Sequence, residues 1–185
     1  MSGIVVATVG LCGTGKSVIT DYFAKEHGFQ TVYFGGRVLE EVRRRGLEVN
    51  AANEKAVREA LREEGGMAVM ASLSLPKIRT LLDEGQDVVI DGLYSYAEYV
   101  ILREHLTDCF SVIAVHAQKP LRYQRLGRRE VRPLTPEQVD ERDLSEIRNL
   151  EKSDPIVLAD YHMVNDADLP ALQTWIEIIL RGIRA

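Results

Sequence analysis

Residues 4–17 read Ile-Val-Val-Ala-Thr-Val-Gly-Leu-Cys-Gly-Thr-Gly-Lys-Ser, and this stretch decides the fold. Its apolar, β-branched start predicts a buried strand over Ile4–Val9. The segment Gly10–Ser17 then matches the pattern GxxxxGK[ST], in which glycines allow backbone N–H groups to curl around a polyphosphate. Because the match lies between a strand and a helix expected to begin near Lys16, the sequence predicts a phosphate-binding loop (P-loop).

The chemistry of this loop predicts ATP and Mg²⁺ as cofactors. The residues assigned to nucleotide binding are Gly10, Cys12, Gly13, Thr14, Gly15, Lys16, Ser17 and Val18. The helix after the loop directs its free N–H groups and positive end at the phosphates. Lys16 is expected to reach the outer phosphates and act in catalysis, while the Ser17 hydroxyl is expected to bind the metal. Cys12 is interpreted as a small filler, because a thiolate would repel bound phosphate.

Four further apolar runs predict the rest of a five-stranded sheet. They are Thr31–Phe34, Asp87–Asp91, Phe110–His116 and Tyr161–Val164. Segments with helical periodicity separate them, which is the pattern of βαβ units, and the nearly continuous apolar runs indicate burial on both faces. The fold class is therefore α/β, a three-layer α/β/α sandwich around a parallel sheet. The apolar spacing over Leu169–Ile183 predicts a final helix packed on that sheet.

The 185 residues fit a single domain with two elaborated regions. Residues 35–86 are too long for one plain crossover and predict a helical, acceptor-binding insertion. Its helices are expected to be interrupted at Gly46, at Gly65 and Gly66, and at Pro76. Residues 119–160 form the second region, in which Thr135 as N-cap and Pro136 at the first position predict the start of a helix.

Asp91 ends the third predicted strand and is expected to lie beside the P-loop. Parallel strands bring their carboxyl ends to the same edge of a sheet, where ligands bind. This is the position of a Walker B acid, which either holds Mg²⁺ or accepts the proton of an attacking hydroxyl. Alternatively, Asp91 only caps the next helix.

An arginine-rich run predicts a lid over the nucleotide. The segment LRYQRLGRREVR carries Arg122, Arg125, Arg128, Arg129 and Arg132 against the single acid Glu130. Guanidinium groups bind phosphate in bidentate fashion, so Arg128 and Arg129 are assigned to stabilising the transferred phosphoryl group. In the alternative, the arginines only pair with acids of the following helix, which are Glu137, Asp140, Glu141, Asp143 and Glu146.

The acceptor side carries weaker signals. The residues assigned to acceptor binding are Gly35, Gly36, Arg37, Arg62, Gly92 and Tyr94. Arginines after the second strand offer positive charge to an acceptor phosphate, and Arg37 is favoured because it lies closest to the strand end. Tyr94 and Tyr96 offer an aromatic wall for a base or a pantetheine-like group, although simple packing explains them equally well.

Composition sets the class of protein. The net charge of −5 argues against nucleic acid as the main partner, so a small-molecule acceptor is expected. Two distant cysteines fit a reducing cytoplasm and neither zinc nor disulfides. No apolar run is long enough to span a bilayer. The chain is expected to be cytoplasmic, without membrane contact, and a monomer or homodimer.

These motifs, taken in order along nearly the whole chain, give a family resemblance. The chain resembles the nucleoside monophosphate kinase superfamily, most closely its dephospho-CoA-kinase-like, adenylate-kinase-related branch of small ATPases. The segments that carry the resemblance are GLCGTGKS (10–17), YFGGRVLEEV (33–42), VVIDGLYS (88–95), AVHAQKPLRYQRLGRR (114–129) and ADYHMVND (159–166). The resemblance implies the strand order 2-3-1-4-5, Arg125 against the adenine, Arg128 or Arg129 at the phosphates, and Asn165 near the base.

The same resemblance implies an ATP-dependent phosphotransferase that acts on dephospho-CoA, a nucleoside monophosphate or a related metabolite. Two departures argue against an ordinary nucleoside monophosphate. Gly36 and Leu39 stand where related kinases carry an Asp and an Arg, and Tyr94 replaces an expected arginine. A nucleotide-binding regulatory ATPase without acceptor turnover is therefore the alternative, and a polynucleotide kinase is disfavoured by the acidic charge.

Overall fold

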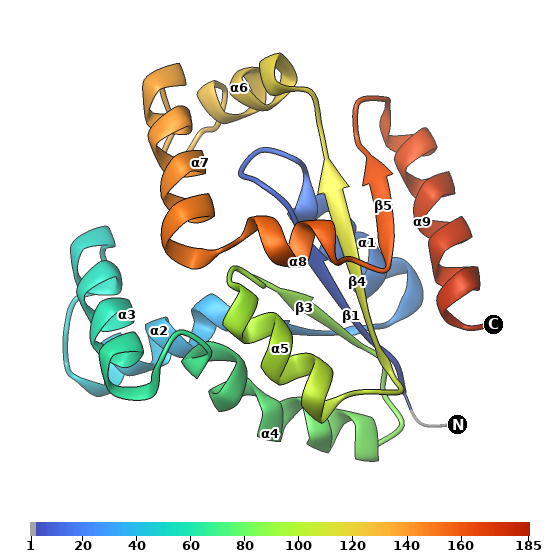
Figure 1. The fold of residues 1–185 in the computed structure, drawn as a ribbon, viewed down its shortest axis with the longest axis horizontal. Coiled ribbons are helices and arrows are strands. Elements are labelled where there is room, and N and C mark those ends of the chain that lie inside the picture. The colour runs from blue at the N-terminus through green and yellow to red at the C-terminus, as the bar shows by residue number, and fades with distance from the viewer. Residues whose placement is uncertain (1–2) are drawn as a thin grey trace.

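Five parallel strands form one sheet in the order β2-β3-β1-β4-β5. A computed structural model describes residues 3–185 (Figure 1). The strands are β1 (Val5–Val9), β2 (Gln30–Tyr33), β3 (Val88–Asp91), β4 (Phe110–His116) and β5 (Tyr161–Val164). The helices are α1 (Lys16–His27), α2 (Phe34–Arg44), α3 (Ala51–Gly65), α4 (Val69–Asp83), α5 (Tyr96–His105), α6 (Lys119–Gly127), α7 (Pro136–Leu150), α8 (Ser153–Val157) and α9 (Leu169–Ile183). The predicted α/β class, strand number and strand order are confirmed.

The sheet is buried on both faces, which makes the three layers. On β1, Val5, Ala7 and Val9 belong to one core cluster, while Val6 belongs to the other, because successive side chains alternate between faces. The first cluster includes residues of α2, α4 and α5, with Ile156 of α8 packed against it. The second is covered by α1 and α9. This two-sided burial explains why the strands read as continuous apolar runs.

Two local expectations were wrong. Phe34 was expected to end the second strand but begins α2, where its side chain is buried in the first core cluster. Pro76 was expected to interrupt a helix but lies inside α4. A proline within a helix costs about 3 kcal/mol or more. Burial of Val69, Met70, Leu75 and Ile78 along α4 offsets that cost.

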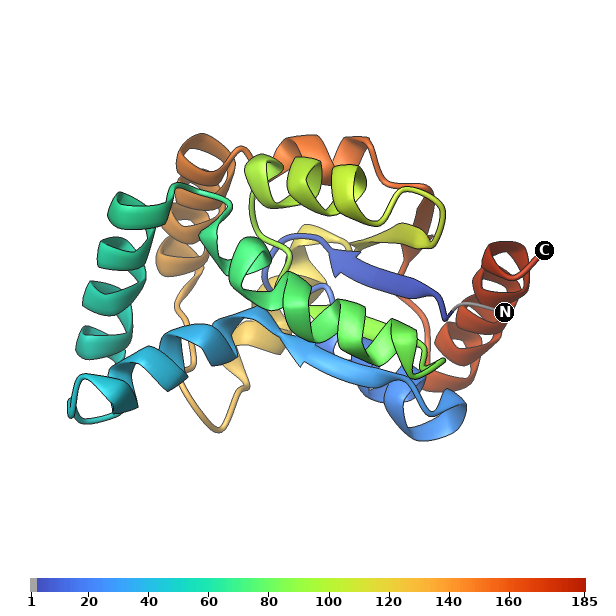
Figure 2. The ribbon, with the colours of Figure 1, turned by 90° about the horizontal axis from the view of Figure 1, so that it is seen from below.

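Parts of the two elaborated regions, α2–α3 and α6–α7, lie at the end of the molecule to which the strands' carboxyl ends point, whereas α4 packs along the sheet (Figures 1 and 2). Helices α2 and α3 extend on one side, and α6 and α7 lie on the other. Arg132, in the loop before α7, joins them through an ion pair with Glu54 of α3 at 3.5 Å. No helix within residues 3–185 is both long enough and apolar enough to cross a membrane.

Candidate nucleotide-binding site

The P-loop has a backbone that only glycine adopts without strain. Gly10, Gly13 and Gly15 have φ values of 147°, 84° and 94°. At Gly15, a Cβ atom would also lie 2.2 Å from Nδ2 of Asn165, and at Gly10 it would lie 2.3 Å from the Val115 carbonyl oxygen. The loop therefore needs glycine both for its turn and for its close approach to neighbouring strands.

Lys16 begins α1, and its side chain turns back onto the P-loop. Its ammonium donates hydrogen bonds to the carbonyl oxygens of Gly10 at 2.8 Å and Leu11 at 3.0 Å. Burial, followed by repulsion from the Lys152 ammonium, lowers the pKa of Lys16 to about 7. A bound anion would favour the charged form and reverse this shift. The site is thus electrostatically suited to polyphosphate.

A cavity of about 390 Å³ opens beside the loop. Its lining residues are Cys12, Gly13, Gly15, Lys16, Ser17, Val18, Tyr33, Asp91, Tyr94, Arg125, Arg129, Arg142, Glu146 and Lys152. The structure therefore brings together most of the predicted loop residues, Asp91, Tyr94 and two of the predicted lid arginines. Gly10 and Thr14 are buried within the P-loop and do not line the cavity.

Asp91 lies at the carboxyl end of β3, where the sequence places it, and lines the cavity together with Ser17. Burial raises the pKa of Asp91, and the nearby Lys16 ammonium opposes this rise. Helix α5 is capped by Ser95 in a capping box with Glu98, so the alternative in which Asp91 caps that helix is wrong. The Ser17 hydroxyl and the Asp91 carboxylate offer the oxygen donors that Mg²⁺ prefers.

The predicted lid arginines separate into different environments. Arg129 and Arg125 line the cavity. Arg125 also donates to the Asn165 carbonyl oxygen at 3.0 Å, and its buried Nη1 has no hydrogen-bond partner among residues 3–185. Arg128, the exposed C-cap residue of α6, is not among the residues that line the cavity. A free buried guanidinium nitrogen next to the P-loop fits an anion or a base edge as its partner.

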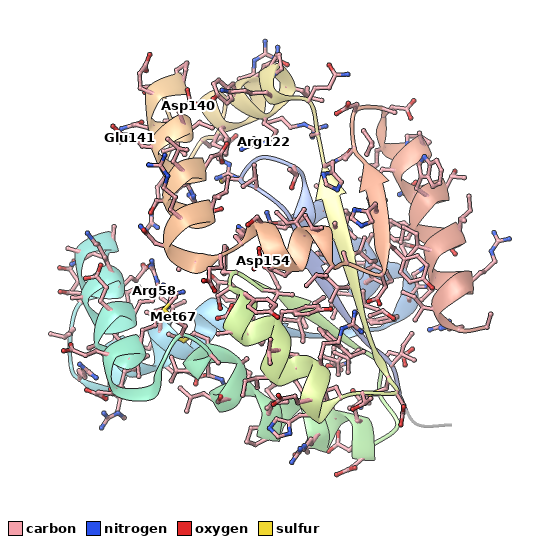
Figure 3. The ribbon with its side chains drawn as sticks, in the orientation of Figure 1. Arg58, Met67, Arg122, Asp140, Glu141 and Asp154 are labelled. Atoms are coloured by element: carbon pink, nitrogen blue, oxygen red, sulfur yellow. The ribbon has the colours of Figure 1, made fainter. Side chains whose placement is uncertain are left out.

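Arg122 has a structural role in the lid. Its Nε donates to the Cys12 carbonyl oxygen at 2.8 Å, and its Nη2 lies 2.7 and 2.6 Å from the Asp143 oxygens. Figure 3 labels Arg122 beside α7 and Asp140 near the start of that helix. For this arginine, pairing with the following helix is the correct interpretation. Cys12 packs with Leu126 and Val139, which agrees with its role as a small filler.

Three charged residues of the cavity were missed by the sequence analysis. Arg142 and Glu146 face the site from α7, and Lys152 faces it from the start of α8. Glu146 accepts from Arg142 Nε at 3.0 Å and from Lys152 Nζ at 2.6 Å. Spacing of four residues on a helix was a signal that Arg142 and Glu146 share a face. No local pattern marks Lys152.

The residues predicted to bind the acceptor lie around the cavity but outside its lining, with the exception of Tyr94. Gly35 packs against the Tyr33 ring, from which a Cβ atom would be 2.3 Å away. Arg37 binds Glu40 at 2.8 Å. Burial lowers the pKa of Arg62, and the negative charge of Glu98 opposes this shift. Gly92 adopts a left-handed φ of 101°. Their part in acceptor binding stays a prediction.

Asn165 follows β5 and supports the P-loop from behind. Its side-chain Nδ2 donates to the Thr14 carbonyl oxygen at 2.9 Å, and its own carbonyl oxygen accepts from Arg125. The residue therefore links the loop after β5 to both the P-loop and the lid helix α6. Its predicted place beside the base is compatible with this position and stays a prediction.

Comparisons with known proteins agree with this geometry. The family model described as an AAA domain matches residues 6–163. A "UPF0200 protein" of Thermococcus gammatolerans is 36% identical over 188 residues and covers 97% of both chains. Another, from Aeropyrum pernix, is 37% identical and covers 92% of this chain and 88% of its own.

Solved structures of small-molecule kinases share the fold. Shikimate kinase from Bacteroides thetaiotaomicron superposes with a TM-score of 0.62 at 11% identity, over 98% of this chain and 99% of that one. A gluconokinase from Sinorhizobium meliloti gives 0.55 at 15% identity, over 99% and 92%. At these identities the likeness shows a P-loop kinase-like fold and leaves the acceptor unspecified.

Proposed function

Since the chain belongs to the AAA domain family and to the UPF0200 proteins, we propose that it is an ATP- and Mg²⁺-dependent phosphotransferase. It transfers the γ-phosphoryl group of ATP to a small phosphorylated or nucleotide-like acceptor, of the dephospho-CoA or nucleoside monophosphate type. The observation that carries the proposal is one cavity lined by Lys16, Ser17, Asp91 and lid arginines. Each of these groups has a task in phosphoryl transfer, where catalysis is mostly positioning and charge stabilisation.

The binding step uses the P-loop. Its backbone N–H groups and the start of α1 hold the phosphates, and Lys16 exchanges the carbonyl oxygens of Gly10 and Leu11 for phosphate oxygens. Ser17 and Asp91 would hold the metal, which offsets charge on the β- and γ-phosphates when bound. Arg129 and Arg125 enclose the nucleotide from α6 and the adjoining loop.

The transfer step needs an oriented acceptor oxygen and the exclusion of water. That oxygen belongs to a hydroxyl in dephospho-CoA and to the phosphate in a nucleoside monophosphate. With a hydroxyl acceptor, and in place of holding the metal, Asp91 would orient that hydroxyl and accept its proton; its raised pKa would make it a better base than an exposed aspartate. Helix α7 closes the cavity through Arg142 and Glu146. Closure matters because ATP would otherwise be hydrolysed by water.

The acceptor enters on the side of α2–α4. Tyr33, whose side chain is half exposed, and Tyr94 line the cavity on that side. Two aromatic rings provide a stacking surface for a base or an apolar contact for a pantetheine-like chain. Arg37 would serve an acceptor phosphate after leaving Glu40, and Arg62 would serve one through its buried Nε, which has no hydrogen-bond partner among residues 3–185.

One observation favours a second candidate function, a nucleotide-responsive regulator without acceptor turnover. Arg37 is bound to Glu40 at 2.8 Å, so its guanidinium is not free for an acceptor in this state. In a regulator, nucleotide binding would move α7 without any transfer.

An ADP-release assay with a panel of acceptors separates the two functions. Mg²⁺–ATP is supplied with and without dephospho-CoA, nucleoside monophosphates and small phosphorylated metabolites. The phosphotransferase requires acceptor-dependent turnover that Lys16→Ala abolishes, while Lys25→Ala, at an exposed lysine of the same helix, keeps it. Tight nucleotide binding without turnover on any acceptor would identify the regulator, and absence of Mg²⁺–nucleotide binding would refute both.

A further inference from the structure

We propose that Lys152 is a second phosphate-binding ammonium of this cavity, which contacts the transferred phosphoryl group and is positioned by Glu146. The inference rests on the proposed function and adds a catalytic residue to it. Sequence reasoning placed only Lys16 and arginines at the phosphates, and Lys152 stands outside every motif of the chain.

Lys152 is buried but lines the cavity. Its side chain is 1% exposed, and its Nζ lies 2.6 Å from Oε2 of Glu146 and 4.4 Å from the centroid of the Tyr94 ring. It shares the cavity lining with Lys16. Burying two ammonium groups in one cavity is unfavourable without an anion between them, so the arrangement favours phosphate.

The backbone around Lys152 is built to present its side chain. The preceding residue, Glu151, has a left-handed φ of 50°, which non-glycine residues rarely adopt. This turn ends α7 and brings the Lys152 N–H to 3.3 Å from the Glu146 carbonyl oxygen. Glu146 therefore fixes both the main chain and the ammonium of Lys152. A left-handed residue is a common way to end a helix, and here it turns the chain so that Lys152 comes back toward Glu146.

Lys152 is anchored to the body of the protein, whereas its partner is part of the lid. Helix α8, which begins after Lys152, packs Ile156 against the first core cluster. Glu146 and Arg142 lie on α7. The Glu146–Lys152 ion pair thus joins lid and body at the hinge. Helix α8 anchors the Lys152 backbone to the body of the protein, while Glu146 positions its ammonium from α7.

The residues that line the cavity carry an excess of positive charge, which favours a bound anion. Among the described residues that line it, five are cationic, namely Lys16, Arg125, Arg129, Arg142 and Lys152, and two are carboxylates, Asp91 and Glu146. Burial opposes ionisation of Glu146, but the charges of Lys152 and Arg142 outweigh it and lower the pKa of this carboxyl. A single carboxylate therefore serves two cations, and each retains hydrogen-bond donors for a ligand.

In the transfer, the acceptor oxygen forms a bond to the γ-phosphorus while the bond from that phosphorus to the β,γ-bridging oxygen breaks. The electron pair of the broken bond leaves with ADP. A hydroxyl acceptor gives its proton to Asp91 acting as the base, whereas a phosphate acceptor attacks as an anion and gives up no proton. Lys152 donates to the γ-phosphoryl oxygens throughout and is not consumed. ADP lacks the γ-phosphoryl oxygens, so a buried donor to those oxygens stabilises the transition state and contributes little to the binding of ADP.

Binding of a transition-state mimic tests this without knowledge of the acceptor. Calorimetry measures the affinity for Mg²⁺–ADP and for Mg²⁺–ADP with aluminium fluoride, which mimics the transferred group. For Lys152→Met, we expect an unchanged ADP affinity and a loss of about tenfold to a hundredfold for the fluoride complex. Lys152→Arg should recover part of the loss. Lys119→Met, an exposed lysine of α6 paired with Asp140, is the control.

A double variant keeps the test valid if Lys152→Met fails to fold. Lys152→Met with Glu146→Gln removes the buried carboxylate together with the ammonium, and its melting temperature verifies folding. Equal affinity of wild type and this folded variant for the fluoride complex would overturn the role of Lys152 alone. Equal losses for ADP and the fluoride complex would also overturn it. Failure of the wild type to bind any Mg²⁺–nucleotide would instead overturn the proposed function and this inference with it.

Discussion

The guanidinium of Arg122 and the carboxylate of Asp143 form a buried ion pair between α6 and α7, with Nη2 at 2.7 and 2.6 Å from the two oxygens. Nε of the same arginine binds the Cys12 carbonyl oxygen of the P-loop. One side chain therefore ties both lid helices to the phosphate site. Removing one partner of a buried pair is costly because the other charge stays desolvated.

Arg122→Ala should accordingly destabilise the protein by about 3–5 kcal/mol. Urea denaturation measures the change in the free energy of unfolding. Arg128→Ala, at an exposed position of the same region, should stay within about 0.5 kcal/mol of wild type. Arg122→Met combined with Asp143→Leu should recover much of the loss, since neither charge is then buried alone. A small effect of Arg122→Ala would show that the pair does not hold the lid.

Nucleotide binding should take up a proton at Lys16. Burial and Lys152 lower the pKa of Lys16 to about 7 in the free protein, so at pH 8 most molecules carry a neutral amine. Bound phosphates favour the ammonium form, and we expect uptake approaching one proton per ATP at pH 8. Calorimetry in buffers with different ionisation enthalpies counts this proton. Lys16→Met should remove it, and an uptake unaffected by that substitution would contradict the assignment.

The same lysine should make the free protein more stable as pH rises. Between the folded pKa of about 7 and the ordinary value of 10.5, the unfolded chain binds more protons, so the free energy of unfolding increases with pH. Lys16→Met lacks this dependence. The variant should exceed wild type in stability at pH 7, and the difference should shrink by pH 9. Paired urea titrations at both pH values measure it; a constant difference would speak against the lowered pKa.

Asp91→Asn should separate binding from turnover. The variant keeps the size of the side chain but loses its charge, so we expect turnover with an accepted acceptor to fall by about 10²–10⁴-fold. If Asp91 is the base, the dependence of binding on Mg²⁺ concentration stays as in wild type. If it organises the metal, the Mg²⁺ requirement for nucleotide binding rises as well. Retention of wild-type turnover would exclude Asp91 from the reaction.

Gly15→Ala should disrupt the loop without removing a functional side chain. The added Cβ would meet Asn165 Nδ2 at 2.2 Å, and alanine is strained at a φ of 94°. We expect loss of Mg²⁺–ATP binding together with a lower melting temperature. Gly28→Ala is the matched control, because its φ of 71° is also left-handed but the added Cβ meets nothing within 4 Å. Nucleotide binding in that variant should remain intact.

The sequence predicts the strands and the phosphate site well because both depend on local patterns. Phe110–His116 and Tyr161–Val164 were predicted to the residue, since burial on both faces produces unbroken apolar runs. The P-loop needs its glycines and its lysine in a fixed order, and Asp91 was found because it ends an apolar strand next to that loop. In each case the physical requirement falls on neighbouring residues.

The charged side of the cavity follows from tertiary packing and leaves little trace in local patterns. Arg142, Glu146 and Lys152 belong to a stretch rich in charged residues. The four-residue spacing shows that Arg142 and Glu146 share a helix face, but it does not show that this face meets the cavity, and no local pattern distinguishes Lys152 from solvated neighbours such as Arg148. Lys152 becomes buried only because α8 docks on the core and Glu151 turns the chain. Similarly, Pro76 is accommodated by the burial of α4, which local propensity does not report.

The hydrogen bond from Asn165 to the Thr14 carbonyl oxygen makes the P-loop depend on the distant end of the chain. The conformation of the P-loop depends in part on the segment after β5, some 150 residues later in the chain. A nascent chain that ended before β5 would carry every phosphate-contacting group, but its P-loop would lack the support that holds it in the phosphate-binding conformation. Nucleotide affinity would thus report completion of the whole sheet, including its last edge strand.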